Sequence, residues 1–213
     1  DIIDIEIDGS QNHKSIVVDS DFFTLGFNSH SSYREVYDYV YNSLLTYVPL
    51  LYNNSKYEIA APSSINSPSD YTALTLEAKD DINELLDAIA GGFVVAPNTE
   101  FGLIFNPKSN NISLRGSSEA VGYSGLIFAN AELNINNNSR DSLSMRVKSD
   151  AVYMGSLLLM PRFNVVAGAR ENRISLTAGF KQEDGSSSAM LGISAQFNRN
   201  ERTRRRSVHI DIT

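Results

Sequence analysis

The stretch that decides the fold runs from Arg173 to Phe197 and reads RISLTAGFKQEDGSSSAMLGISAQF. Apolar and polar side chains alternate over residues 173–180 and again over 190–197, as they do in strands with one buried face. Residues 183–187 between these parts are polar and include a glycine, which is typical of a turn. Two strands joined by a short turn pair in opposite directions, so the stretch predicts antiparallel sheet.

The same unit recurs on both sides of this hairpin. Further strand-like segments are predicted at 101–105, 112–115, 126–129, 132–135, 143–148 and 208–212. A polar turn is predicted at 136–140, and the chain as a whole is rich in turn-forming residues, with 20 Asn and 28 Ser among 213 residues. Strands at this spacing favour an antiparallel sandwich or barrel over a parallel sheet with helical crossovers.

The N-terminal portion combines strands with helices. Ile3, Ile5 and Ile7 alternate with three acidic residues and predict a half-buried strand. A second strand is expected to begin at 15–18, and shorter strands are predicted at 57–60 and 71–76.

Two amphipathic helices are also predicted in this portion. The first covers residues 32–48, where a capping box of Ser32 and Glu35 opens a stripe of apolar residues that ends before Pro49. The second begins near Asp81 and ends at the glycine pair 91–92.

These elements together predict an α+β protein. It is expected to be predominantly antiparallel β, with a sandwich or barrel-like C-terminal half and two amphipathic helices in the N-terminal half. We interpret residues 1–213 as a single domain, divided into an acidic, helix-bearing portion (1–92) and a basic, β-rich portion (93–213).

Charge is distributed unevenly along the chain. Residues 1–100 contain 16 acidic and 4 basic residues, a net charge of −12, whereas residues 101–213 contain 9 acidic and 14 basic residues, a net charge of +5. The total of −7 and the pI of about 4.9 argue against nucleic acid as a partner. A chain with opposite charge on its two halves is suited to association, although two unevenly charged solvated faces would give the same pattern.

Several classes of function are disfavoured by what the sequence lacks. The absence of cysteine excludes disulfides, thiolate metal sites and thiol nucleophiles. The three histidines, His13, His30 and His209, are not at ligand spacing, and no phosphate-binding loop, dinucleotide fingerprint or nucleophile elbow is present. We therefore expect no cofactor, no metal and no catalytic residues, and the interpretation leans towards a protein that is not an enzyme. No apolar run approaches the ~18 residues of a membrane-spanning helix, so no membrane span is expected.

One cluster of charge stands out as a candidate binding site. Five arginines fall within eight residues, namely Arg199, Arg202, Arg204, Arg205 and Arg206. Guanidinium groups bind carboxylates in a bidentate manner, and the three acids of the first strand, Asp4, Glu6 and Asp8, are the candidate partners. The pairing could occur within one chain or between chains, and a solvated basic turn is the alternative.

The function predicted from these observations is structural. We expect a non-enzymatic structural or interaction protein, a subunit of a larger assembly such as a virion, a phage tail or a surface structure, with protein subunits as its partners. The alternative is a secreted domain that binds or cleaves carbohydrate. A virion, secreted or surface location is favoured by these readings.

Overall fold

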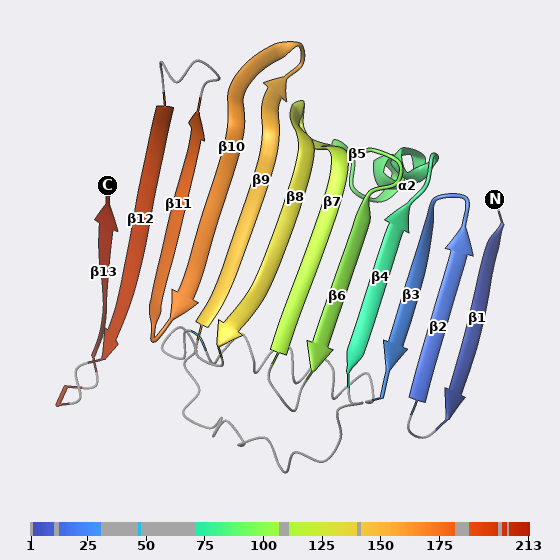
Figure 1. Ribbon diagram of the computed structural model, residues 1–213, viewed down its shortest axis with the longest axis horizontal. Coiled ribbons are helices and arrows are strands. Elements are labelled where there is room, and N and C mark those ends of the chain that lie inside the picture. The colour runs from blue at the N-terminus through green and yellow to red at the C-terminus, as the bar shows by residue number, and fades with distance from the viewer. Residues whose placement is uncertain are drawn as a thin grey trace.

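One antiparallel sheet makes up most of the molecule. The computed structural model describes residues 2–10, 13–30, 47, 71–106, 111–139, 142–181, 188–199, 202–203 and 205–213. Within these residues 13 strands form a single sheet, and all but one follow each other across it in the order of the sequence (Figure 1). The exception is β5 (Phe93–Val95), which pairs with β7 (Asn111–Tyr123). The prediction of antiparallel sheet is therefore confirmed.

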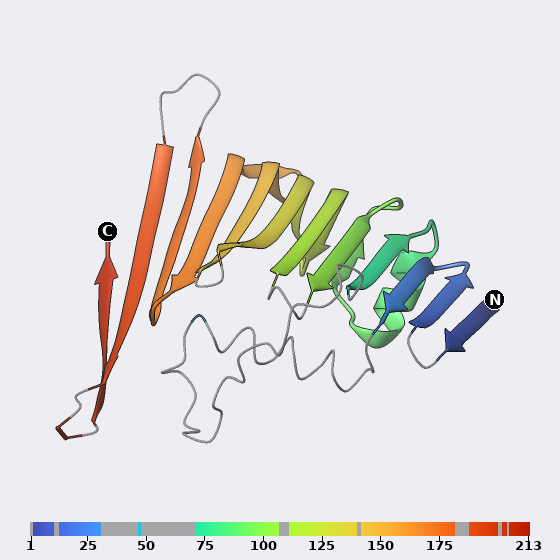
Figure 2. The ribbon, with the colours of Figure 1, turned by 60° about the horizontal axis from the view of Figure 1, so that its bottom comes forward.

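The outer strands are shorter than the central ones. The strands on the N-terminal side are β1 (Ile3–Ser10), β2 (His13–Ser20), β3 (Phe23–Ser29), β4 (Thr72–Ala78) and β6 (Glu100–Asn106). Beyond β7 lie β8 (Leu126–Ser139), β9 (Ser142–Met154), β10 (Leu157–Arg170), β11 (Arg173–Lys181), β12 (Ser188–Arg199) and β13 (Arg206–Ile212). The strands rotate progressively from one edge to the other (Figure 2), as the right-handed twist of each strand requires.

The predicted α+β class is wrong. The described residues are nearly all strand, form one sheet rather than the two packed sheets of a sandwich, and contain one short helix, α2 (Ile82–Ile89), instead of two amphipathic helices. The N-terminal strands pair directly with the rest of the sheet. The helix predicted over residues 32–48, except Tyr47, and the strand predicted at 57–60 lie outside the described residues.

The helix α2 lies in the connection between β4 and β6. Asp81 precedes it but makes no side-chain capping hydrogen bond, contrary to its cap-like sequence. The Asn83 side chain holds α2 to β5 instead, since it donates to the Val95 carbonyl oxygen (3.0 Å) and accepts from the Val95 N–H (2.9 Å). Ile82 is buried, whereas Ile89 at the other end is 70% exposed. No helix in the described part of the chain is long and apolar enough to cross a membrane.

The register of the sheet aligns apolar side chains into continuous rows. Cross-strand partners in an antiparallel sheet share a face, so each row can be followed from strand to strand. The first row contains Ile5, Val18, Leu25, Leu76, Phe101, Gly116, Leu133, Val147, Val165, Ala178 and Leu191. The second contains Ile7, Ile16, Phe27, Leu74, Leu103, Leu114, Ile135, Met145, Ala167, Leu176, Ile193 and Ile212. We call the side of the sheet that carries these two rows the apolar face.

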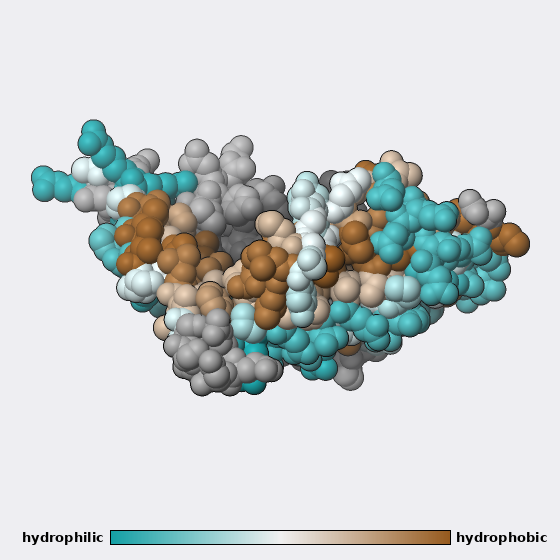
Figure 3. All heavy atoms as spheres, turned by 90° about the horizontal axis from the view of Figure 1, so that it is seen from above, coloured by the Kyte–Doolittle hydropathy of each residue, from teal (hydrophilic) through white to brown (hydrophobic). Residues whose placement is uncertain are grey.

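The other side of the sheet is mainly polar. The row between the two apolar rows points the opposite way, because successive side chains of a strand alternate between faces. It contains Glu6, Val17, Gly26, Thr75, Gly102, Arg115, Asn134, Arg146, Val166, Thr177 and Gly192. In the view along the strands, apolar side chains gather in a band on one side of the sheet and hydrophilic ones line the other (Figure 3). We call this second side the polar face.

A sheet of one layer leaves little of the chain fully buried. The buried apolar residues of the described part are Tyr47, Ala78, Ile82, Phe105, Ile112, Ala151 and Val152. The accessible surface of the molecule is 14349 Å², whereas a compact monomer of 23.5 kDa exposes only about 9,800 Å². Most side chains of the apolar rows are therefore half-buried or exposed.

Close backbone packing makes Gly122 the most sensitive glycine of the central strands. A Cβ atom added there would lie 2.5 Å from the Leu126 carbonyl oxygen, a backbone atom that cannot move without disturbing the β7–β8 pairing. Gly122→Ala should therefore lower the free energy of unfolding by about 1–3 kcal/mol. Gly102→Ala is the matched control, because nothing lies within 4 Å of its added Cβ. Urea denaturation of both variants checks this, and equal stabilities would contradict the β7–β8 register.

Candidate interaction surfaces

The outermost strand at the N-terminal edge presents its whole length to solvent. All eight residues of β1 are exposed, and among the strands of the described residues β1 pairs on one side only, with β2. Ile5 and Ile7 on the apolar face are 57% and 73% exposed. The β1 strand of the described chain thus combines a free backbone edge with uncovered apolar side chains.

The C-terminal edge has the same character. All seven residues of β13 are exposed and pair on one side with β12. The apolar side chains of β13, Val208, Ile210 and Ile212, are 51%, 60% and 68% exposed. The apolar face therefore continues to the last strand at both edges.

The structure places the predicted arginine site around the turn between β12 and β13. Arg199 ends β12 and Arg206 begins β13, and the two are cross-strand partners. Arg202 and Arg205 lie in the intervening turn and are exposed, while Arg204 lies outside the described residues. Like charges on opposite positions repel, so Arg199 and Arg206 destabilise this end of the hairpin unless anions lie close to them.

The predicted acidic partners lie at the far end of the sheet. Asp4, Glu6 and Asp8 are exposed on the polar side of β1. Since β1 and β13 are the two outermost strands of the path, the structure does not bring these acids and the arginines together within one chain (Figure 1).

Charge along the polar face also changes from the β1 edge towards the β13 edge. The row that continues from Asp4 contains Asp19, Thr24, Glu77, Glu100, Ser117, Glu132, Lys148 and Asn164. Its acids therefore lie in strands β1 to β8, and its lysine lies in β9. The unequal charge of the two halves of the sequence becomes a gradient in space, acidic at the β1 edge and basic at the β12–β13 turn.

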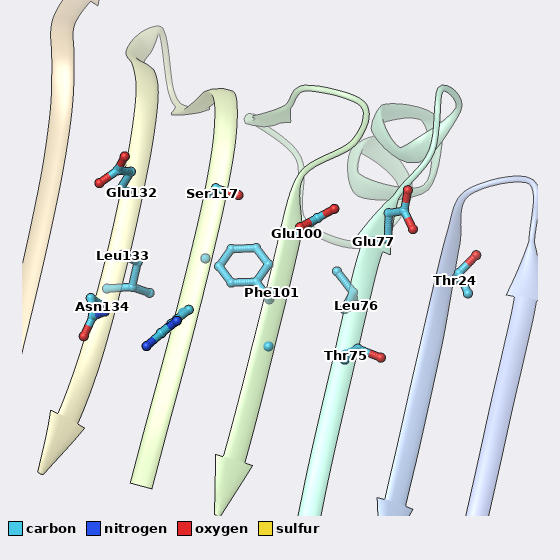
Figure 4. Close-up of a pocket in the computed structure, with 13 residues that line it drawn as sticks. Thr24, Thr75, Leu76, Glu77, Glu100, Phe101, Ser117, Glu132, Leu133 and Asn134 are labelled. Atoms are coloured by element: carbon cyan, nitrogen blue, oxygen red, sulfur yellow. The ribbon is translucent and has the colours of Figure 1, made fainter.

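A shallow groove of 670 Å³ crosses the polar side of the middle strands. Glu77, Glu100 and Glu132 point along it from β4, β6 and β8 (Figure 4), and Arg115 and Asn134 also line it. Glu100 and Glu132 lie on β6 and β8. These two strands are separated by β7, so their backbones lie about 9.5 Å apart. All three glutamates are exposed and lie at the surface of the sheet rather than in an enclosed cleft.

One ion pair links the turn region of β2 to the segment after β4. The Lys79 Nζ atom donates to Asp19 Oδ1 at 2.7 Å, and the Thr24 hydroxyl donates to the same oxygen at 2.7 Å. The hydrogen bond from Lys79, followed by that from Thr24, holds the pKa of Asp19 below its ordinary value. Asp19 is thus held as a structural anion at the top of β2.

Comparison with known proteins adds no assignment, since no family model, no curated protein and no solved structure matches this chain. The surfaces therefore have to be interpreted from their own chemistry. Sequence reasoning recognised the charged clusters at both edges, but it missed the apolar face. The signal was present as alternation within single strands, and only the register shows that these positions line up across the sheet.

Acidification should remove the contribution of the Lys79–Asp19 pair to the stability of the fold. A carboxyl group with a lowered pKa stabilises the fold above the pKa of the unfolded chain, and the effect is lost as pH falls through the folded pKa. Lys79→Gln should therefore lower Tm slightly at pH 7 and leave it unchanged at about pH 2. Lys181→Gln, an exposed lysine at the end of β11, controls for the loss of one charge. A Lys79→Gln effect of equal size at both pH values would contradict this assignment.

Proposed function

We propose that this chain is a non-enzymatic interaction protein that extends a β-sheet assembly by strand addition at β1 and β13. The observation that carries the proposal is that the apolar face reaches both outer strands: both apolar rows begin in β1, and the second ends at Ile212 of β13. A sheet that ended there would leave apolar side chains and unpaired backbone groups in water at both edges.

The edge strands lack most of the devices that stop unwanted pairing. Natural edge strands are protected by proline, by charged side chains and above all lysine, by bulges or by inward-pointing charges. Strand β1 reads IDIEIDGS and β13 reads RSVHIDI, with no proline or lysine in either, and both pair with their neighbours in unbroken register. Their charged side chains lie on the polar face, apart from Arg206 at the start of β13. These edges are suited to receiving a further strand.

Strand direction favours head-to-tail addition of a second copy. The path contains twelve strands in alternating directions, so β1 and β13 run antiparallel to each other. A second copy placed beside the first in the same orientation presents its β1 antiparallel to β13. The isoleucines of β13, Ile210 and Ile212, then share a face with Ile5 and Ile7 of the added copy, and the apolar face becomes longer.

The charge gradient supports the same arrangement. The arginines of the β12–β13 turn in one copy approach Asp8, the acid nearest the facing end of β1 in the next copy, and Glu6 and Asp4 follow it along the strand. Exposed ion pairs contribute only about 0–1 kcal/mol each, so they steer and register the contact, and the strand pairing provides most of the affinity. Because such addition repeats, an extended structure such as a virion, a phage tail or a surface fibre is the proposed setting.

Neutralising the arginine run should weaken association without affecting the fold. Changing Arg204, Arg205 and Arg206 to Gln should reduce the fraction of assembled protein at low salt, as measured by sedimentation velocity. Salt at 1 M, where the Debye length is roughly 3 Å, should do the same to the unaltered chain. Changing Arg162, Arg170 and Arg173 to Gln removes the same charge from another part of the sheet and is the control. Equal association of all three proteins would exclude the proposed contact, and a lowered Tm of the first variant would place its pairing within the chain.

A second candidate function is favoured by the uniformity of the apolar face. Over twelve strands, a length of roughly 53 Å, the second apolar row contains no polar side chain. Hydrocarbon chains have no polar groups to pair, so a row without polar side chains is suited to them, as it is to the apolar side of a second sheet. We propose that this face binds extended hydrocarbon, and that assembly would lengthen the surface available to it.

A fluorescent fatty acid tests this second function. Leu114→Gln, in the middle of the apolar face, should weaken binding of the fatty acid about tenfold, because it places an amide in an apolar row. Ser113→Gln, on the same strand but the opposite face, should leave binding unchanged. Circular dichroism checks that both variants are folded. Absence of binding to the unaltered chain would exclude the function.

The carbohydrate alternative stays a prediction. Its site would be the groove of the polar face, where carboxylate and amide groups could bind hydroxyl groups. The single aromatic residue among those lining the groove in the described chain is Phe101, whose side chain belongs to the first row of the apolar face. The groove therefore offers little of the aromatic surface on which sugar rings pack.

A further inference from the structure

The apolar side of the last hairpin ends in a pair of arginines. Arg199 of β12 and Arg206 of β13 are cross-strand partners, and both are exposed. Two positions further along the hairpin, Phe197 pairs with Val208. Positions two apart on a strand point to the same side of the sheet, so the two arginines and this apolar pair share the apolar face. The hairpin therefore places two positive charges at one end of an apolar surface.

An uncovered apolar stripe leads away from the arginines along β13. Val208, Ile210 and Ile212 are 51%, 60% and 68% exposed, and Ile193 of β12, the partner of Ile212, is 37% exposed. The distance from Arg206 to Ile212 along the strand is about 20 Å. The acyl chains of one bilayer leaflet, half of the hydrocarbon core, extend about 15 Å. The stripe is therefore long enough to hold one extended acyl chain.

The arginine pair is suited to a phosphate group. Residues at directly opposite positions have Cβ atoms about 4.5–5.5 Å apart, so Arg199 and Arg206 repel each other and can both reach one anion. A phosphate monoester has a charge of about −1.5 to −2 and three acceptor oxygens. It can accept hydrogen bonds from both guanidinium groups, whereas the two oxygens of a carboxylate are matched by one bidentate arginine. The charge and the number of donors thus favour phosphate.

We propose that the apolar face of the β12–β13 hairpin binds a lipid with a phosphate monoester headgroup. The phosphate lies between Arg199 and Arg206, and the acyl chain lies over Val208, Ile210 and Ile212. This inference rests on the hydrocarbon binding proposed above, and adds to it the headgroup and the direction of the chain. The lipid covers a face of the hairpin and leaves the backbone edge of β13 open to a further strand.

Two amphiphiles with the same alkyl chain test the headgroup. Decyl phosphate and the uncharged decyl maltoside are titrated below their micelle concentrations into the whole chain, at a dilution where sedimentation velocity shows monomers. Calorimetry should show that the phosphate binds about tenfold more tightly, because it adds charge-assisted hydrogen bonds. Arg199→Gln should remove most of this difference and leave the affinity for decyl maltoside unchanged. Arg173→Gln is the matched control and should change neither affinity. Arg173 lies on the adjacent strand β11 opposite Gln196, whose side chain belongs to the polar face.

A substitution in the stripe tests the position of the chain. Ile210→Gln should weaken both amphiphiles by a similar factor, because it places an amide beneath the alkyl chain. Circular dichroism checks that every variant is folded. Unchanged binding of both amphiphiles to this variant would overturn the position proposed for the chain.

The remaining outcomes separate this inference from the function on which it rests. Equal binding of the two amphiphiles to the unaltered chain, or an Arg173→Gln effect as large as that of Arg199→Gln, would overturn the phosphate site and leave hydrocarbon binding standing. Failure of both amphiphiles to bind would overturn hydrocarbon binding and this inference together. Displacement of decyl phosphate by an equal concentration of inorganic phosphate would also overturn it, because the arginines would then bind free phosphate rather than a lipid.

Discussion

The structure depends on one constraint: along the main path, each strand forms hydrogen bonds only with the strands before and after it in the sequence. Within the described residues this pairing builds a single sheet whose outermost strands, β1 and β13, each pair with one neighbouring strand. The pairing also assigns every side chain of the sheet to one of two faces, since successive side chains of a strand point to opposite sides. The apolar face, the polar face and the charge gradient all follow from a register that is kept over eleven strand pairings.

A single layer of this kind differs from an ordinary globular core. In a sandwich, the apolar side of one sheet is covered by another sheet, whereas here most of the apolar rows are half-buried or exposed. Such a surface requires apolar material to cover it, and exposed patches of this size mark interaction sites. Edge addition and hydrocarbon binding would both cover exposed apolar side chains. Edge addition covers them at the ends of the rows, and hydrocarbon binding covers them along the rows.

Local patterns made some of this structure predictable. The alternation in β11 and β12 correctly indicated a hairpin. The isoleucines of β1 correctly indicated a strand, but the strand is exposed along its whole length rather than half-buried. Strand β10 was missed, because Pro161 and the left-handed Arg162 (φ 49°) interrupt its pattern in the middle of the sheet. Strand β8 was divided into two segments, since Asn130 (φ 48°) resembles a turn but bends a continuous strand. Its amide donates to Asp150 on β9 at 2.9 Å and helps to keep that bend within the ladder.

The candidate site was predictable only as separate parts. Charge counts and arginine spacing are local properties, and both clusters lie on exposed elements as expected. The apolar rows and the meeting of Arg199 with Arg206 on the apolar face arise from pairing between strands, which the sequence alone does not specify. The α+β prediction failed for a related reason: the predicted strands join one continuous sheet, and the helix α2 within the described residues is short.

Hydrogen exchange as a function of protein concentration tests the central claim, that the sheet is open at both edges and closes them by adding strands. In dilute solution the outward-facing amides of β1 and β13 should exchange rapidly, while those of β7 to β10 stay protected. Raising the concentration should slow exchange in β1 and β13 together and leave the central strands unchanged. Equal protection of β1, β13 and the central strands at every concentration would contradict the account, because it would mean that both edges are already paired within one chain.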